Sequence, residues 1–282
     1  LLFSTPHIED NISGVILNDE TIRQGYIPLG LYNRVSFIEL LQAKGIVPGV
    51  KVDKGTIQFN NTETITEGLD GLKDRLKDYY LAGLRFAKWR SVFKVGVSFL
   101  SIKSNSNSLA LYAKICQDIK MIPIVEPEVL MDGSHSIKQA QITTEDVWSE
   151  VFGKLHTYHV DIKNVILKPN MIMSGYANSM NNEEVANHTL QSLNEYVPPI
   201  VPGATFLSGG QKDNDAILNL KLINKIAKEN PLYYKWRLTF SYGRALQNLA
   251  MKTWNGLNSN QQKSQEVFIK QAKSCYKASL GF

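Results

Sequence analysis

Lys168 is the one charged residue in an otherwise apolar, strand-like run, residues 165–171. A lysine held among apolar side chains loses hydration, so its charged form is disfavoured and its pKa falls. The free amine that results at neutral pH can attack a carbonyl carbon and form a Schiff base. Alternatively, Lys168 ends the strand and extends its ammonium group to water, as lysines near strand ends commonly do. The other charged residues distinguish these two interpretations.

Polar residues two positions apart recur near the ends of three successive strand-like runs. They are Lys88 with Arg90, Glu126 with Glu128, and Lys168 with Asn170, while Lys51, followed by Asp53, closes an earlier run. Residues two apart on a strand point to the same face, so these charges face one side together. Burying them is costly unless they pair or act in chemistry. A neutralised salt-bridge network is one interpretation, but the same layout on three strands favours a catalytic site.

Two glycine turns with polar side chains follow the last strand-like runs. They are Ser208-Gly209-Gly210 and Ser241-Tyr242-Gly243-Arg244. Backbone amides and a guanidinium are groups that bind a phosphate dianion well. One such turn is a weak signal, whereas two at the last strands of a barrel predict a phosphate site.

Seven strand-like runs alternate with helical stretches, and this order sets the scaffold that must position the charges. The runs are residues 14–17, 45–52, 84–92, 122–129, 164–171, 204–208 and 237–242. Apolar residues three and four apart predict helices between them, whereas the polar stretch 103–108 predicts a surface loop. Such alternation indicates parallel βα units. The stretches that carry apolar stripes include Leu69, Leu72, Leu76 and Tyr80, and Ala216, Leu220, Ile223 and Ala227.

The sequence favours an α/β fold of the TIM (β/α)8 barrel type, with seven of its eight strands evident. The glycine fingerprint of a doubly wound sheet does not occur in the sequence. In a barrel, catalytic residues lie at the C-terminal ends of several strands, which is where these charges fall. We expect a single barrel domain over residues 1–282. Because the chain begins at Leu1, we also expect this domain to be N-terminally truncated, with the first strand outside it.

The composition of the chain indicates which binding partners and which cellular location to expect. The net charge of +5 comes from scattered lysines, which argues against nucleic acid and fits a small phosphorylated substrate. No apolar stretch is long enough to span a membrane, and the two cysteines are too few for a disulfide framework, so we expect a cytoplasmic protein. His156 and His159 lack an evident third ligand, so we expect no metal.

Seven motifs, in order along nearly the whole chain, together resemble the class I fructose-bisphosphate aldolase family. The first four are Gly-Val-Lys-Val-Asp-Lys-Gly at 49–55, Gly-Leu-Asp-Gly-Leu at 68–72, Phe-Ala-Lys-Trp-Arg at 86–90 and Pro-Ile-Val-Glu-Pro-Glu at 123–128. The others are Leu-Lys-Pro-Asn-Met at 167–171, Phe-Leu-Ser-Gly-Gly-Gln at 206–211 and Leu-Thr-Phe-Ser-Tyr-Gly-Arg-Ala-Leu-Gln at 238–247.

The resemblance implies a lyase of glycolysis and gluconeogenesis. Such an enzyme reversibly cleaves fructose bisphosphate to dihydroxyacetone phosphate and glyceraldehyde 3-phosphate, without metal or other cofactor. It implies that Lys168 forms the imine, that Glu126 is the general acid and base, and that Glu128 and Lys88 assist. It implies substrate-binding roles for Ser208, Gly209, Ser241, Gly243 and Arg244 at the ketose phosphate, and for Arg90 and Lys51 at the far phosphate. It also implies a homotetramer.

The chain departs from the family pattern in two places, and two alternatives to a functional fructose-bisphosphate aldolase stay open. The family's first barrel strand, which carries an aspartate, and its C-terminal tail, which ends in a tyrosine, have no counterpart in the sequence. One alternative is a catalytically impaired homologue that acts as a binding or scaffold protein. Another is a different Schiff-base aldolase or transaldolase, which would need only one phosphate site.

Overall fold

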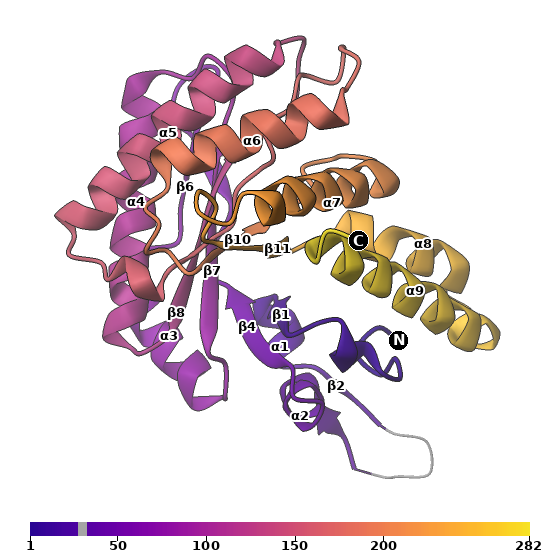
Figure 1. Ribbon diagram of the computed structural model, residues 1–282. Coiled ribbons are helices and arrows are strands. Elements are labelled where there is room, and N and C mark those ends of the chain that lie inside the picture. Colours follow the sequence, from indigo (N-terminus) through magenta and orange to yellow (C-terminus); the bar gives the residue numbers. More distant parts are fainter. Residues whose placement is uncertain (28–32) are drawn as a thin grey trace.

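A curled parallel sheet of seven strands forms the centre of the protein in a computed structural model, which describes residues 1–27 and 33–282. The strands lie in the order β1-β4-β7-β8-β9-β10-β11 (Figure 1). Their bounds are β1 (Gly14–Leu17), β4 (Val47–Lys51), β7 (Phe86–Phe93), β8 (Ile122–Val129), β9 (Ile166–Leu167), β10 (Gly203–Phe206) and β11 (Arg237–Phe240).

Helices connect successive strands and cover the outer side of the sheet (Figure 1). The parallel pairing of all neighbouring strands confirms the predicted βα units and the α/β barrel class. The helices are α1 (Asp19–Ile22), α2 (Phe37–Ala43), α3 (Leu72–Leu81), α4 (Phe99–Asp118), α5 (Ile137–Thr157), α6 (Asn182–Tyr196), α7 (Asp213–Glu229), α8 (Arg244–Trp254) and α9 (Gln261–Ser279). Within residues 1–27 and 33–282, no helix is both long and apolar enough to cross a membrane.

Alternation along β7 sends apolar side chains outward to the helices and charged side chains inward. Trp89 is fully buried and stacks on Tyr112 of α4, with ring centroids 5.5 Å apart. The Tyr112 hydroxyl reaches the carbonyl oxygens of Ala87 at 2.7 Å and Ile124 at 3.1 Å, and so fixes α4 across β7 and β8. Lys88 and Arg90, which flank Trp89, therefore point to the opposite, inner face.

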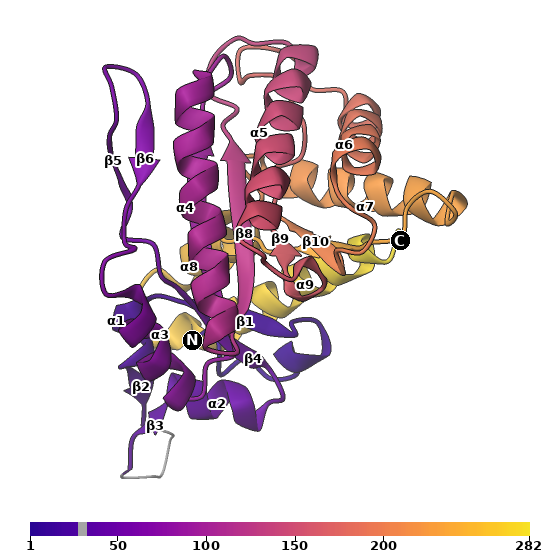
Figure 2. The ribbon, with the colours of Figure 1, turned by 90° about the vertical axis from the view of Figure 1, so that its left-hand side faces the viewer.

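The prediction of a surface loop at residues 103–108 is wrong, because this stretch lies within α4. Ser98 caps the helix by accepting a hydrogen bond from the Ser101 amide at 3.2 Å. Asn105 is fully buried, and its side chain bonds the backbone of Thr64 and Thr66 in a two-stranded hairpin. Figure 2 shows this hairpin, β5 (Thr56–Gln58) and β6 (Thr64–Thr66), beside α4. These tertiary contacts override the weak helix propensity of serine and asparagine.

The strand that precedes Lys168 is shorter than the predicted run 164–171. Only Ile166–Leu167 pairs as regular strand, because Pro169 has no amide hydrogen with which to continue the ladder. The extended course nevertheless persists for two residues. The Lys168 amide donates to Val125 O at 2.8 Å, and Pro169 O accepts from the Leu207 amide at 3.0 Å. Lys168 therefore lies at the C-terminal end of its strand.

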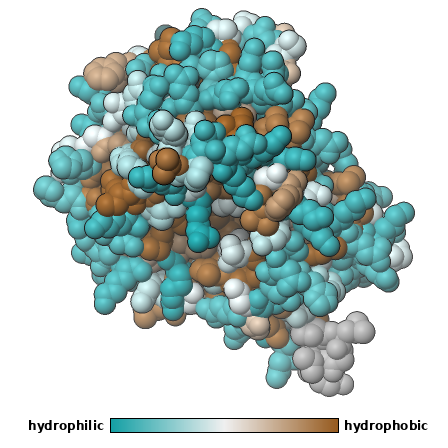
Figure 3. Space-filling view, in the orientation of Figure 1, coloured by the Kyte–Doolittle hydropathy of each residue, from teal (hydrophilic) through white to brown (hydrophobic). Residues whose placement is uncertain are grey.

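The two edge strands of the sheet, β1 and β11, do not pair with each other within the part of the chain that the structure describes. Between them lies a cavity of about 1200 Å³, lined by residues of both edges and by Lys168. Figure 3 shows hydrophobic residues in a hollow of one molecular face. A second small sheet, β2 (Gly25–Tyr26) and β3 (Val35–Ser36), precedes α2.

We predict that Gly203→Ala destabilises the protein by about 1–3 kcal/mol, the usual cost of forcing an extra carbon into a packed site. A Cβ on Gly203 of β10 would lie 2.5 Å from the Arg237 carbonyl oxygen of β11, and this backbone atom is held in the sheet. The free energy of unfolding in urea measures the effect.

Gly153→Ala is the matched control, because a Cβ at this position in α5 meets nothing within 4 Å. We expect it to stabilise the protein by roughly 0.5–1 kcal/mol, the helix preference of alanine over glycine. Equal effects of the two substitutions would contradict the close packing of β10 against β11.

Candidate active site

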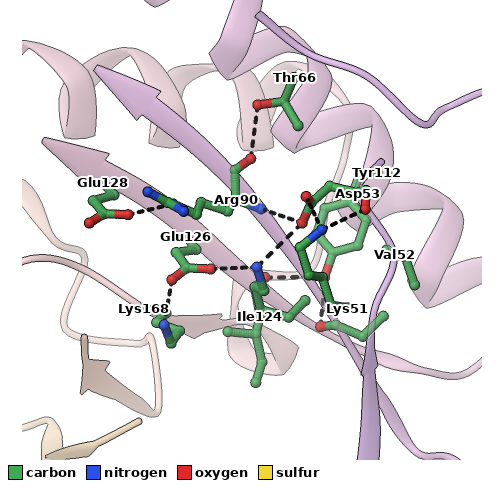
Figure 4. Close-up of polar contacts among 12 residues, drawn as sticks. Lys51, Val52, Asp53, Thr66, Arg90, Tyr112, Ile124, Glu126, Glu128 and Lys168 are labelled. Carbon is green, nitrogen blue, oxygen red and sulfur yellow. Dashed lines mark hydrogen bonds and ion pairs between the residues drawn. The ribbon is translucent and has the colours of Figure 1, made fainter. Parts of the chain in front are cut away.

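Glu126 of β8 lies at the centre of a buried group of charges (Figure 4). Its Oε1 accepts a hydrogen bond from Lys168 Nζ, and its Oε2 lies 2.8 Å from Lys88 Nζ. The exposed fractions of the Glu126, Lys88 and Lys168 side chains are 4%, 8% and 9%. The neighbouring strands β7 and β8, and the residue just after β9, therefore each contribute one charged side chain to a single buried contact.

Asp53, just beyond β4, extends this group on the side of Lys88. Its carboxylate lies 3.3 Å from Lys88 Nζ and 2.7 Å from Lys51 Nζ, and it accepts the Arg90 amide at 3.2 Å. The result is a row of alternating charge, which we call the charged row: Lys51, Asp53, Lys88, Glu126 and Lys168. No role was predicted for Asp53 from the sequence. Its spacing of two from Lys51 was nevertheless a signal, because residues two apart on a strand point to the same face of the sheet.

Arg90 and Glu128 form a second ion pair one level further along the strands, with Nε and Oε2 2.5 Å apart. In the sheet register Arg90 lies opposite Glu126, yet Glu126 binds Lys88 and Arg90 binds Glu128. Each pair therefore joins residues offset by two positions. Strands of a barrel tilt against its axis, so side chains at one level come from staggered positions.

Burial and neighbouring charges shift the pKa values of these groups in different directions. Burial, and then the charge of Lys88, lowers the pKa of Lys168, although the Glu126 carboxylate opposes this. Burial alone would raise the pKa of Glu126, but the cations Lys168 and Lys88 outweigh it and hold that pKa below its ordinary value. The pKa of Glu128 is raised, chiefly by burial. Lys168 is thus an amine of lowered pKa in direct contact with a carboxylate.

The two predicted phosphate turns follow β10 and β11. Gly209 and Gly210 have φ angles of 53° and 82°, in the left-handed region that glycine adopts without strain. Arg244 begins α8 with an exposed side chain, and no carboxylate of residues 1–27 or 33–282 lies within 4.0 Å of its guanidinium. Its charge is therefore free to meet an anion.

The structure brings the predicted site residues together in two groups. Ion pairs join Lys51, Lys88, Glu126 and Lys168 directly or through Asp53, while Arg90 and Glu128 form a separate ion pair beside them, linked to Asp53 by the Arg90 amide. Ser208, Gly209, Ser241, Gly243 and Arg244 follow the next two strands, and Ser241 and Gly243 line the same cavity as Lys168. Asn170 instead accepts the Val129 amide at 2.9 Å, which is a structural role.

Tyr176 also lies at the glycine turn, although no sequence signal marked it. Its hydroxyl donates a hydrogen bond to Gly209 O at 3.3 Å. Among the residues that the structure describes, no group of three or more histidine, cysteine, aspartate or glutamate side chains could hold a metal ion.

A parallel barrel sheet with a buried lysine and carboxylates at its C-terminal strand ends defines an enzyme of the (β/α)8 class. Comparison with known proteins identifies the family. A family model described as "Fructose-bisphosphate aldolase class-I" matches residues 1–282. Members of this class act without a metal ion.

Individual relatives agree with that match. "Fructose-bisphosphate aldolase 6, cytosolic" of Arabidopsis thaliana is 44% identical over 100% of this chain and 78% of its own length. "Fructose-bisphosphate aldolase 1" of Toxoplasma gondii is also 44% identical, over 100% of this chain and 77% of its own. A crystal structure of fructose-bisphosphate aldolase from Plasmodium falciparum, in complex with TRAP and an inhibitor, superposes with a TM-score of 0.93. It is 42% identical and covers 99% of this chain and 80% of that one.

The chain therefore belongs to the class I fructose-bisphosphate aldolase family. The reaction of this family is the reversible cleavage of fructose bisphosphate into two triose phosphates. The comparisons favour this function over that of a scaffold protein.

We predict that Glu126→Gln destabilises the protein by about 3 kcal/mol, because it leaves Lys88 and Lys168 buried without their shared anion. Arg90→Gln is the comparison, since it also removes one member of an ion pair, but the Arg90 side chain is 43% exposed. We expect it to cost no more than about 1 kcal/mol. Urea unfolding at neutral pH compares the two, and a larger loss for Arg90→Gln would contradict the central place of Glu126.

Proposed function

We propose that Lys168 forms a Schiff base with the ketone of fructose bisphosphate and that Glu126 carries the protons of the reaction. The observation that carries this proposal is the direct contact between the buried Lys168 amine and the Glu126 carboxylate. Cleaving the carbon–carbon bond beside a ketone needs an electron sink. A protonated imine accepts the electron pair better than a neutral carbonyl does, which is why an amine nucleophile suits this reaction.

The contact between Lys168 and Glu126 supports the proton transfers that an imine requires. A proton that moves from the Lys168 ammonium to Glu126 leaves a free amine, which attacks the ketone carbon. The protonated Glu126 then returns that proton to the carbinolamine oxygen, which leaves as water and gives the iminium ion. The regenerated carboxylate takes the proton of the hydroxyl at the bond to be cleaved, and the bonding electrons pass to the iminium nitrogen.

Lys88 and Asp53 assist these proton transfers without taking part in them. Lys88 lowers the pKa of both neighbours, so it favours the amine form of Lys168 and the ionised form of Glu126. Asp53 holds Lys88 and Lys51 in place through ion pairs of 3.3 and 2.7 Å. Glu128, whose pKa burial raises, is a second proton carrier close to the first.

Positively charged side chains lie in two separate places, at Arg244 and at Arg90 with Lys51, and this suits a substrate that carries two phosphates. We assign the ketose phosphate to Ser208, Gly209, Ser241, Gly243 and Arg244, and the far phosphate to Arg90 and Lys51. The Arg244 guanidinium and the amides of the glycine turn suit the first phosphate. Arg90 is part exposed and Lys51 lies at the rim of the charged row, so both are accessible to the second.

The resemblance also implies a domain organisation, an oligomeric state and a cellular location, and these three remain predictions. We propose that residues 1–282 act as one barrel domain within a homotetramer and that the enzyme works in the cytosol. The last point is supported by the names of relatives such as the cytosolic Arabidopsis enzymes.

Lys168→Ala is expected to abolish the covalent adduct that borohydride traps in the presence of dihydroxyacetone phosphate. Activity with fructose bisphosphate should fall below about one thousandth of the wild-type rate, as on loss of other catalytic nucleophiles. The adduct is located by mass spectrometry of peptides. Lys163→Ala is the control, because Lys163 is an exposed lysine shortly before the same strand and should leave rate and adduct unchanged. An adduct that persists in Lys168→Ala would refute the assignment.

Arg244→Ala and Arg90→Ala should separate the two phosphates. We expect Arg244→Ala to raise KM at least about tenfold for both fructose 1,6-bisphosphate and fructose 1-phosphate, because each carries the ketose phosphate. Arg90→Ala should raise KM for the bisphosphate alone. Steady-state kinetics with both substrates measures this pattern. If Arg90→Ala changes neither KM, the far phosphate is not bound there, and an enzyme with one phosphate site becomes the better account.

A further inference from the structure

Tyr176 places a hydroxyl group at the glycine turn from the loop that follows Lys168. Its Oη donates to Gly209 O at 3.3 Å. A Cβ built on Gly210 would overlap the Tyr176 hydroxyl oxygen. The same Cβ would lie 3.7 Å from a terminal nitrogen of Arg244. The hydroxyl is thus packed directly against the turn, and the Arg244 guanidinium lies close to the same point of the turn.

The loop around Tyr176 is fixed by backbone contacts with the loop that follows β8. The Tyr176 amide donates to Met131 O at 3.0 Å, and the Gly175 amide donates to His135 O at 2.9 Å. A Cβ on Gly175 would overlap the Gly133 carbonyl oxygen, so the two loops approach as closely as glycine allows. The Asn178 side chain adds a bond to His135 O at 2.9 Å. Tyr176 is therefore held in place independently of its own hydroxyl.

The electrostatic surroundings keep the Tyr176 hydroxyl protonated. Burial and the charge of Asp132 raise its pKa, and Glu128 adds to this, while Arg244 opposes it. A protonated phenol is a hydrogen-bond donor and brings no negative charge to the site. It can therefore approach a phosphate dianion without repulsion.

We propose that Tyr176 is a further binding residue for the ketose phosphate, which its hydroxyl contacts together with Arg244 and the glycine turn. This inference rests on the proposed function, because it assumes the phosphate site at Ser208, Gly209 and Arg244. In the free protein the hydroxyl bonds a neutral carbonyl at 3.3 Å, which is long for such a bond. A phosphate oxygen offers a shorter, charge-assisted bond, so the hydroxyl changes partner on binding.

The test is Tyr176→Phe, which keeps the ring and removes only the donor. We expect KM for both fructose 1,6-bisphosphate and fructose 1-phosphate to rise by a similar factor, about tenfold, with kcat within about twofold of wild type. The concentration of dihydroxyacetone phosphate that gives half-maximal borohydride trapping at Lys168 should rise in parallel, while the maximal adduct stays the same. Inorganic phosphate should also inhibit the variant more weakly than the wild type.

Tyr233→Phe is the matched control, because it makes the same change at an exposed tyrosine before β11, at the other end of the strands from the phosphate turns. It should leave every constant unchanged. Unchanged constants in Tyr176→Phe would overturn the inference, and so would a rise in KM for the bisphosphate alone, since that places the hydroxyl at the far phosphate. A wild-type protein without any trapped adduct would instead refute the proposed function itself.

Discussion

One carboxylate shared by two buried lysines is the interaction on which the site depends. Glu126 accepts a hydrogen bond from Lys168 and lies 2.8 Å from Lys88, and all three side chains are buried. Without this anion, two cations would repel each other in a medium that screens charge poorly. With it, Lys168 stays in the interior, where burial and the charge of Lys88 lower its pKa. The same contact thus stabilises the folded site and gives the Lys168 proton an acceptor, although the carboxylate by itself raises the pKa of the lysine.

The barrel geometry makes this sharing possible. Polar residues at spacing two lie within β7 and β8 and just after β9, and the tilt of the strands brings staggered positions to one level. The outward residues between the charges, such as Trp89, pack against α4 and hold the strands in register. Asp53 then carries the alternation of charge to the adjacent strand. Fold and site are therefore two aspects of one pattern, apolar side chains outward and charged side chains inward.

Sequence reasoning succeeded where a periodic pattern controls the structure. The spacing of two on strands identified Lys88, Glu126 and Lys168 as neighbours on one face, and the alternation of strands and helices identified the class of fold. It failed at residues 103–108, because the buried contacts of Asn105 outweigh local propensity and depend on a hairpin that the pattern does not reveal. It also passed over Tyr176, whose position follows from two loops meeting in space. Loop contacts of this kind leave no periodic signal in the chain.

The alternation of charge along the charged row has a consequence for the total charge held inside the sheet. When all five side chains are ionised, Lys51, Lys88 and Lys168 supply three positive charges, whereas Asp53 and Glu126 supply two negative ones. The row then carries one net positive charge in a poorly hydrated place. Release of one proton from Lys168 to the solvent would leave two lysines balanced by two carboxylates, so the row would become neutral at the moment when its amine is free.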